Sequence, residues 1–206
     1  MYVSGILDRM RRDSARNRRA LLDAARRVFE AQGIDAPLED VAEAAGLSRT
    51  SLHRQFSSRA ELLAEIWAGD VEETEADAAR FAGYPDAFVR LFDATMTQQI
   101  DRRRIHPDAA QIESPEIVAL AARFVAAVER TIEVSRRAGV LRRDLTDAAG
   151  VRTLGMAIMA VWTPADRDER VRVAAEVRDV LLRGVLDPAS ASLAEPEAPR
   201  AHGHPA

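Results

Sequence analysis

The sequence contains no cysteine and no lysine, and aromatic residues make up only 5% of it. The absence of cysteine excludes disulfides, thiolate metal sites and cysteine nucleophiles. Alanine dominates the apolar residues, which amount to 47% of the chain, so the composition favours helices over strands. No stretch alternates polar and apolar residues with a period of two. We therefore predict an all-α fold, with about nine helices.

Long hydrophobic runs are also missing. The longest uncharged apolar run, Leu154–Trp162, is too short to span a bilayer. Arg9, Arg11 and Arg12 interrupt the N-terminal region where a secretion signal would need an uninterrupted apolar segment. We therefore expect a cytoplasmic protein without a membrane partner.

Charge is unevenly distributed along the chain. The formal net charge of −4 argues against a general nucleic-acid coat protein. Residues 1–60, however, carry eleven arginines against eight acidic residues, whereas the remainder carries eighteen against twenty-five. A basic N-terminal part on an acidic remainder fits local contact with DNA, with the acidic part held away from the phosphates.

Glycines, helix-capping residues and changes in composition divide the chain into four predicted segments. Ser4-Gly5 and the early arginines indicate an N-terminal arm over 1–12. A helix-turn-helix domain is predicted over 13–58, with its first helix starting near Asp13 or Ser14 and ending at Gly33. A helical domain is expected over 59–186. Residues 187–206, rich in Pro, Ala, Ser and Glu, have little to bury and are predicted to be disordered.

Six helices are predicted in the larger domain. The Ser58-x-x-Glu61 spacing of a capping box opens the first, which runs to about Gly83. Later helices are expected over 86–104, in a short piece up to Ile112, and from Pro115 to Ala138. Thr146 is suited to cap the next helix, and Thr163-Pro164 to open the last.

The most informative segment is residues 38–56. A helix-turn-helix needs a small residue where its two short helices touch, and Ala42 supplies it. Its tight turn needs a residue that tolerates positive φ, and Gly46 supplies that. The buried positions of the motif are then expected to be Val41, Leu47, Leu52 and Phe56.

The third helix, capped by Ser48, presents a polar face. On a wheel of about 100° per residue, Thr50 and Arg54 lie opposite Leu52 and Phe56, with Ser51 and His53 flanking them. Such a face suits the major groove, and a guanidinium at Arg54 could bond both acceptors of a guanine edge. At the helix N-terminus, Ser48 and Arg49 are placed for a phosphate.

Residues from about Arg16 to Trp67 resemble the DNA-binding domain of the tetracycline-repressor (TetR) family. Three motifs carry the likeness: Ala24-Ala25-x-x-Val28-Phe29-x-x-x-Gly33, Val41-Ala42-x-x-Ala45-Gly46-Leu47-Ser48, and Ser51-Leu52-x-x-x-Phe56-x-Ser58-Arg59-x-x-Leu62-Leu63. The resemblance implies a homodimer that binds double-stranded operator DNA and a C-terminal part that senses a small-molecule effector.

Carried over position by position, the family's DNA contacts fall on Arg49, Thr50, Ser51 and His53, with Arg59 at the basic position that opens the fourth helix. The family usually has tyrosine where this chain has His53. In the family this tyrosine contacts a phosphate. Because an imidazole is shorter than a phenol, His53 reaches less far toward that phosphate.

Two sets of residues are predicted in the larger domain. The last two helices are apolar on more than one face, which fits either burial within one chain or a four-helix dimer interface; the resemblance favours the dimer. The predicted interface residues are Gly155, Ile158, Trp162, Val173, Val177, Val180, Leu181 and Gly184. Polar residues interrupt apolar stripes elsewhere, as in a ligand pocket. The predicted pocket residues are Trp67, Phe92, Met96, Gln99, Phe124 and Met159.

Catalytic patterns are not found. None of the four histidines has a glutamate three positions before it, and no glycine-rich phosphate loop is present. We therefore expect no enzyme activity, no cofactor and no metal. The main prediction is a repressor released from its operator by the effector. The alternatives are a helical interaction module, including a regulator that has lost DNA binding, and an enzyme with an incidental helix-turn-helix segment.

Overall fold

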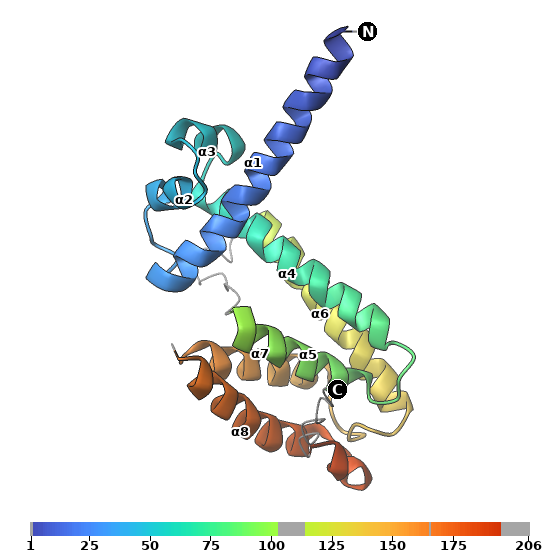
Figure 1. Cartoon of the computed structure of the whole chain (residues 1–206). Helices are drawn as coiled ribbons and strands as arrows, with labels where there is room; N and C mark the ends of the chain where they lie inside the picture. The colour runs from blue at the N-terminus through green and yellow to red at the C-terminus, as the bar shows by residue number, and fades with distance from the viewer. Residues whose placement is uncertain (1, 103–113, 165, 195–206) are drawn as a thin grey trace, which may run out of the picture. The chain divides into compact units, whose positions relative to one another are not determined.

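The computed structural model describes residues 2–102, 114–164 and 166–194, and these residues form eight α-helices and one 3-10 helix (Figure 1). No strand occurs in these ranges, so the all-α prediction is confirmed. The elements are α1 (Tyr2–Gln32), α2 (Leu38–Ala44), α3 (Arg49–Gln55), α4 (Arg59–Phe81), α5 (Ala87–Arg102), α6 (Pro115–Arg137), α7 (Asp147–Trp162), α8 (Arg167–Val185) and η1 (Pro188–Ala194). The short helical piece predicted to end at Ile112 lies outside the described residues.

The chain divides into two compact units. The first contains the chain up to Glu73 and the part of α6 up to Arg123, and the second contains Thr74–Arg102 and the chain from Phe124 onward. Helix α4 therefore contributes residues to both units. The predicted boundary at residue 58 falls inside the first unit, because Leu62, Leu63 and Ile66 of α4 are buried in that unit's core.

The core of the first unit joins α1, α2, α3 and the start of α4. From α1 the buried side chains follow helical spacing, and they meet Val41 and Ala42 of α2 and Leu52 of α3. The α1 residues in this core are Leu21, Ala24, Ala25, Val28 and Phe29. Helix α1 ends as predicted at Gly33, whose φ of +91° is a conformation that glycine adopts without steric cost.

The N-terminal arm predicted over 1–12 is wrong for the residues that the structure describes, because α1 begins at Tyr2 rather than near Asp13. The segment from Tyr2 to Gln32 contains no proline and a single glycine. That glycine lowers helix stability by about 1 kcal/mol, and a helix that is already nucleated further along can absorb this loss. Residues 9–16 of α1 are exposed, so helix propensity rather than packing maintains this part of the helix.

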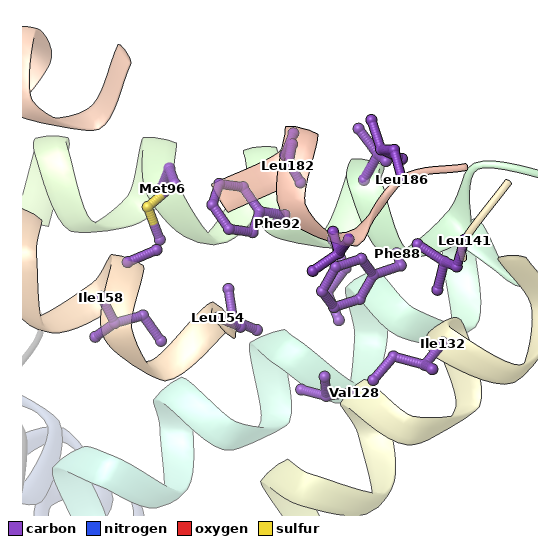
Figure 2. Close-up of a cluster of buried hydrophobic side chains, with 14 of the residues drawn as sticks. Phe88, Phe92, Met96, Val128, Ile132, Leu141, Leu154, Ile158, Leu182 and Leu186 are labelled. Atoms are coloured by element: carbon purple, nitrogen blue, oxygen red, sulfur yellow. The ribbon is translucent and has the colours of Figure 1, made fainter. Parts of the chain in front are cut away.

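The second unit is built around a continuous apolar core. Figure 2 shows Phe88, Phe92 and Met96 of α5 facing Leu154 and Ile158 of α7. Thr146 caps α7 as predicted, its side chain accepting a hydrogen bond from the backbone N of Ala149 at 3.2 Å. Helix α8 begins later than Thr163-Pro164 suggested, because Asp166 caps it by accepting a hydrogen bond from the backbone N of Glu169.

The predicted disordered tail is ordered at its start. The backbone N of Asp187 donates to the carbonyl of Val140 at 2.8 Å, and the backbone N of Arg142 donates to the carbonyl of Val185 at 3.0 Å. These bonds hold the segment after α8 against the α6–α7 connection, and η1 follows directly. Residues 195–206 of the predicted tail lie outside the described residues.

Candidate nucleic-acid interface

Helices α2 and α3 cross around the predicted small residue and glycine. Ala42 is buried, and its carbonyl accepts a hydrogen bond from the backbone N of Leu47 at 2.9 Å. Gly46 has a φ of +66°, in the left-handed region where a residue with a Cβ atom is strained. The helix-turn-helix geometry therefore rests on the two positions that the sequence indicated.

Helix α3 buries its apolar side and exposes its polar side. Its N-cap Ser48 accepts a hydrogen bond from the backbone N of Ser51 at 3.2 Å. Leu52 is fully buried, and the following Phe56 is 1% exposed. Thr50, His53 and Arg54 are exposed to solvent. The short helix thus presents the polar edge that a reader of the major groove needs.

Arg49 already has partners within the first unit. Its guanidinium forms an ion pair with Glu39 of α2 at 2.8 Å, and its Nε donates to Nε2 of His53 at 3.4 Å. The Arg49 side chain is nevertheless 68% exposed. Because a phosphate would compete with Glu39 for this guanidinium, Glu39 opposes the predicted phosphate contact.

Arg18 of α1, absent from the predicted site, positions α3. Its guanidinium lies over the Phe56 ring, 4.3 Å from the centroid, and donates to the carbonyl of Gln55 at the end of α3. Nε of Arg18 also donates to Glu65 of α4 at 2.9 Å. One side chain therefore ties α1, α3 and α4 together. Sequence reasoning had no signal for it, since its partners lie 37 to 47 positions away.

Arg59 is turned into the first unit. It is half-buried, donates to the carbonyl of Ile34 and lies 5.6 Å from the centroid of the Phe29 ring. The start of α4 is further fixed by Glu61, which accepts hydrogen bonds from the hydroxyl and the backbone N of Ser57, both at 2.7 Å. The hydroxyl of Ser57, followed by its backbone N–H, holds the pKa of Glu61 below its usual value. The predicted phosphate contact of Arg59 stays a prediction.

The predicted pocket residues are only partly brought together. In the second unit Phe92, Met96 and Gln99 are buried on α5, and the half-buried Phe124 of α6 packs against the same core. Trp67 belongs to the first unit. Met159 is 51% exposed on α7 and is not part of this core, so its role in a pocket stays a prediction.

A hollow of about 790 Å³ opens elsewhere in the second unit, between the end of α4 and α6. None of the six predicted pocket residues lines it. Its lining residues are Ala78, Ala79, Ala82, Ala126, Glu129, Arg130, Glu133, Val134, Arg137 and Asp147. This mixture of alanines and charged side chains differs from the apolar cavity with a few polar groups that the sequence indicated.

The predicted dimer residues fall into three groups. Ile158 is wrong as an interface residue, because it is 5% exposed and lies in the core of its own chain. Trp162, Val173, Val177 and Leu181 are half-buried, whereas Val180 and Gly184 are exposed and Gly155 is half-buried. Met156, which the sequence did not single out, is 55% exposed beside Met159. Both methionines line a shallow hollow on α7 with Arg152 and Gly155.

Metal ligands and membrane spans are both missing from the described parts of the chain. There, no three histidine, aspartate or glutamate side chains come together in a group that could hold a metal ion. In the same residues no helix combines the length and the hydrophobicity needed to cross a membrane.

Comparison with known proteins matches the helix-turn-helix segment to a family model. Residues 21–66, which hold α2, α3 and their packing partners, match the model of the bacterial regulatory proteins of the tetR family. The chain therefore contains a segment of the tetR type, and this match covers less than half of its length. The chain is also 29% identical over 105 residues to the HTH-type transcriptional regulator AcrR of Shigella flexneri. That match covers 46% of the chain and 48% of AcrR, so the chain matches about half the length of this relative.

Solved structures agree on the fold. The TetR family protein CprB from S. coelicolor A3(2) superposes with a TM-score of 0.67 at 17% identity, over 88% of this chain and 96% of CprB. The fatty acid degradation regulator FadR from Bacillus halodurans gives a TM-score of 0.64 at 14% identity, over 80% of this chain and 97% of FadR. At these identities the likeness shows the fold alone.

Proposed function

We propose that this chain is a DNA-binding transcriptional regulator that binds a two-fold operator as a homodimer and is released from it by a small-molecule effector. One observation carries the proposal: α3 exposes Thr50, His53 and Arg54 while Leu52 beneath them is fully buried. A solvated polar edge of this kind, on a helix fixed by a glycine turn, is the arrangement by which helix-turn-helix proteins read base edges.

The residues of α3 have separate roles in this proposal. Arg54 reads a base, because its planar guanidinium can bond both acceptors of guanine. Ser48, Arg49 and Ser51 contact phosphate at the N-terminal end of the helix, where the dipole favours an anion. Thr50 and His53 flank the base contact. In a dimer the two copies of α3 would lie about 34–36 Å apart, one turn of the DNA helix.

Apolar side chains on α7 and α8 support the homodimer. Met156 and Met159 on α7 and Val180 on α8 are 51–68% exposed, which is unusual for large apolar residues on a surface that stays in water. Gly155 and Gly184 leave open space beside them, so another helix can approach. Two helices from each chain would then form a four-helix interface.

The second unit supports an effector site. Thr95, Gln99 and Thr131 are each 1% exposed, so their polar groups lie within an otherwise apolar region. An effector that binds one conformation of the dimer better than another shifts the population by its difference in affinity and no more. Because α4 contributes residues to both units, we propose that it transmits this change. A ligand that bound the second unit tightly and left operator affinity unchanged would refute this step.

Replacing Arg54 with alanine tests the assignment of base reading. The variant should lose about 1–3 kcal/mol of operator affinity and relax the preference at one base pair, because a bidentate contact to guanine disappears. Because Arg54 is exposed, we expect Arg54→Ala to fold like the wild type. Competition binding with operators that vary at single positions measures both effects.

Arg143, exposed in the α6–α7 connection of the second unit, offers a matched control. Arg143→Ala removes the same charge and should leave operator affinity and base preference unchanged. An equal loss for every DNA sequence in Arg54→Ala would make Arg54 a phosphate contact. Full activity of Arg54→Ala would remove α3 from the proposed interface.

Glu39→Gln is expected to strengthen DNA binding. The substitution removes the anion that holds Arg49 and also removes a negative charge next to the phosphates. Since exposed ion pairs contribute about 0.2–1 kcal/mol, we expect a gain of roughly two- to fivefold per site, larger at low salt. Titration of operator DNA at two salt concentrations measures it. In an Arg49→Ala background the gain should shrink, and an undiminished gain would show that Glu39 does not act through Arg49.

A further inference from the structure

The histidine of α3 makes a contact that depends on its protonation state. Nε of Arg49, one helical turn earlier, donates a hydrogen bond to Nε2 of His53 at 3.4 Å. An imidazole nitrogen accepts a hydrogen bond only when it carries no proton, and the charged ring has an N–H at both nitrogens. The contact therefore requires the neutral form of His53.

The charged groups nearest His53 come from α3 and α2. On α3 they are Arg49 and the neighbouring Arg54, both exposed. Helix α2 carries three carboxylates, those of Glu39, Asp40 and Glu43. Of these, Glu39 forms the ion pair with Arg49 at 2.8 Å. In the free chain the imidazole thus lies next to a guanidinium whose charge Glu39 already offsets.

Helix α1 contacts α3 on a different side. Nε2 of Gln55 donates to Oγ of Ser14 at 2.9 Å, and Gln55 lies about 200° from His53 around the helix axis. At the same end of α3, Arg18 donates to the carbonyl of Gln55 and binds Glu65 of α4. The charged groups that α1 and α4 bring to this contact therefore lie away from the imidazole.

A DNA phosphate would change the charge balance at His53. In the free chain a proton on His53 removes the acceptor for Arg49 and places a second positive charge beside that guanidinium, which is unfavourable. A phosphate bound by Arg49 adds negative charge next to both side chains and favours the charged imidazole. This attraction acts directly or through a bridging water, so the short reach of the imidazole does not prevent it.

We propose that His53 makes operator binding depend on pH, because binding takes up a proton at its imidazole. The inference rests on the proposed function, since it needs the phosphate that Arg49 contacts. The sign follows from linkage: when the bound state holds more protons than the free state, affinity rises as the pH falls. An ordinary imidazole is half-protonated near pH 6.5, so the change should occur between about pH 8 and pH 6.

The test measures the affinity of the full-length chain for a duplex carrying the promoter of its own gene across this pH range. The wild type should gain about three- to tenfold in affinity per half-site from pH 8 to pH 6. The slope of log affinity against log salt should steepen by up to about 0.9 per half-site, because one more phosphate is neutralised. Circular dichroism at both ends of the range verifies that the fold is unchanged.

Three substitutions isolate the contribution of His53. His53→Gln keeps a neutral side chain, so its affinity should not change with pH. His53→Lys carries a fixed positive charge and should bind more tightly than the wild type at about pH 8, also without pH dependence. His106→Gln removes one of the other three histidines and should keep the wild-type pH profile. A wild-type profile in His53→Gln would place the proton elsewhere and overturn the proposal.

The outcomes separate this inference from the proposed function. If the wild type prefers the promoter duplex to an unrelated one and Arg54→Ala relaxes that preference, while affinity stays constant with pH, the pH proposal fails and the regulator stands. An affinity that fell toward acidic pH would show that DNA binds the neutral ring, and would also overturn the proposal. If the wild type binds the promoter duplex at no pH, the proposed function fails together with the pH dependence.

Discussion

Replacing both Met156 and Met159 with glutamate is expected to convert the proposed homodimer into monomers. Both side chains are more than half exposed on α7, so the isolated chain should tolerate the change. A dimer interface would instead bury four unpaired carboxylates, each at a cost of several kcal/mol. Sedimentation equilibrium should show the monomer mass, and operator affinity should fall by about 10²–10⁴, the gain that bivalent binding supplies.

Val118 provides the control for this result. It is an exposed apolar residue of α6, 53% accessible, and belongs to the first unit rather than to α7 or α8. Val118→Glu should leave both the dimer mass and the operator affinity unchanged. A wild type that is already monomeric at micromolar concentration, or a double glutamate variant that remains dimeric, would contradict the proposed interface.

Phe56→Ala is expected to produce the largest loss of stability. The ring is 1% exposed, packs in the core of the first unit and carries the Arg18 guanidinium on its face. Removing a buried phenyl group from a core costs about 3–5 kcal/mol. The substitution also removes the platform that holds Arg18 against the end of α3. Urea unfolding of the variant should show the destabilisation, and DNA binding should fall with the fraction folded.

Phe81→Ala serves as the comparison, because Phe81 is half-buried in the second unit. It should destabilise the chain less and leave the first unit able to bind DNA. If Phe56→Ala abolished DNA binding while changing the free energy of unfolding by less than about 1 kcal/mol, the ring would contribute to the interface itself rather than to the core.

The helix-turn-helix could be predicted from the sequence because its determinants are local. The side chain of Ser48 caps α3 by accepting a hydrogen bond from a backbone N–H only three residues later in the sequence. The positive φ of Gly46 likewise belongs to a single turn. Leu52 and Phe56 then follow the period of one helix. Each of these features depends on neighbours within a few positions, where propensity and spacing carry most of the information.

The sequence predictions failed where contacts between residues far apart in the sequence, or the lack of such contacts, determine the structure. Leu154–Trp162 is apolar on all sides, so its period could not show which face is buried. Ile158 was predicted at the dimer interface but is buried within its own chain, and Met159 was predicted in a pocket but is 51% exposed. Arg18 is one of 29 basic residues, and nothing near it in the sequence indicates Phe56 or Glu65. The start of α1 was missed for the opposite reason, since residues 9–16 are exposed and no pattern of buried residues marks them as helical.

The shape of α3 has a consequence for how such a regulator can change its target. Of its seven residues only Leu52 is buried, so the side chains that we propose to read bases are separate from those that hold the fold together. Exposed substitutions usually alter stability by no more than about 0.5 kcal/mol. Thr50, His53 and Arg54 can therefore be exchanged almost without penalty to folding. From the proposed base-reading role we expect a library restricted to these three codons to yield variants with new operator preferences.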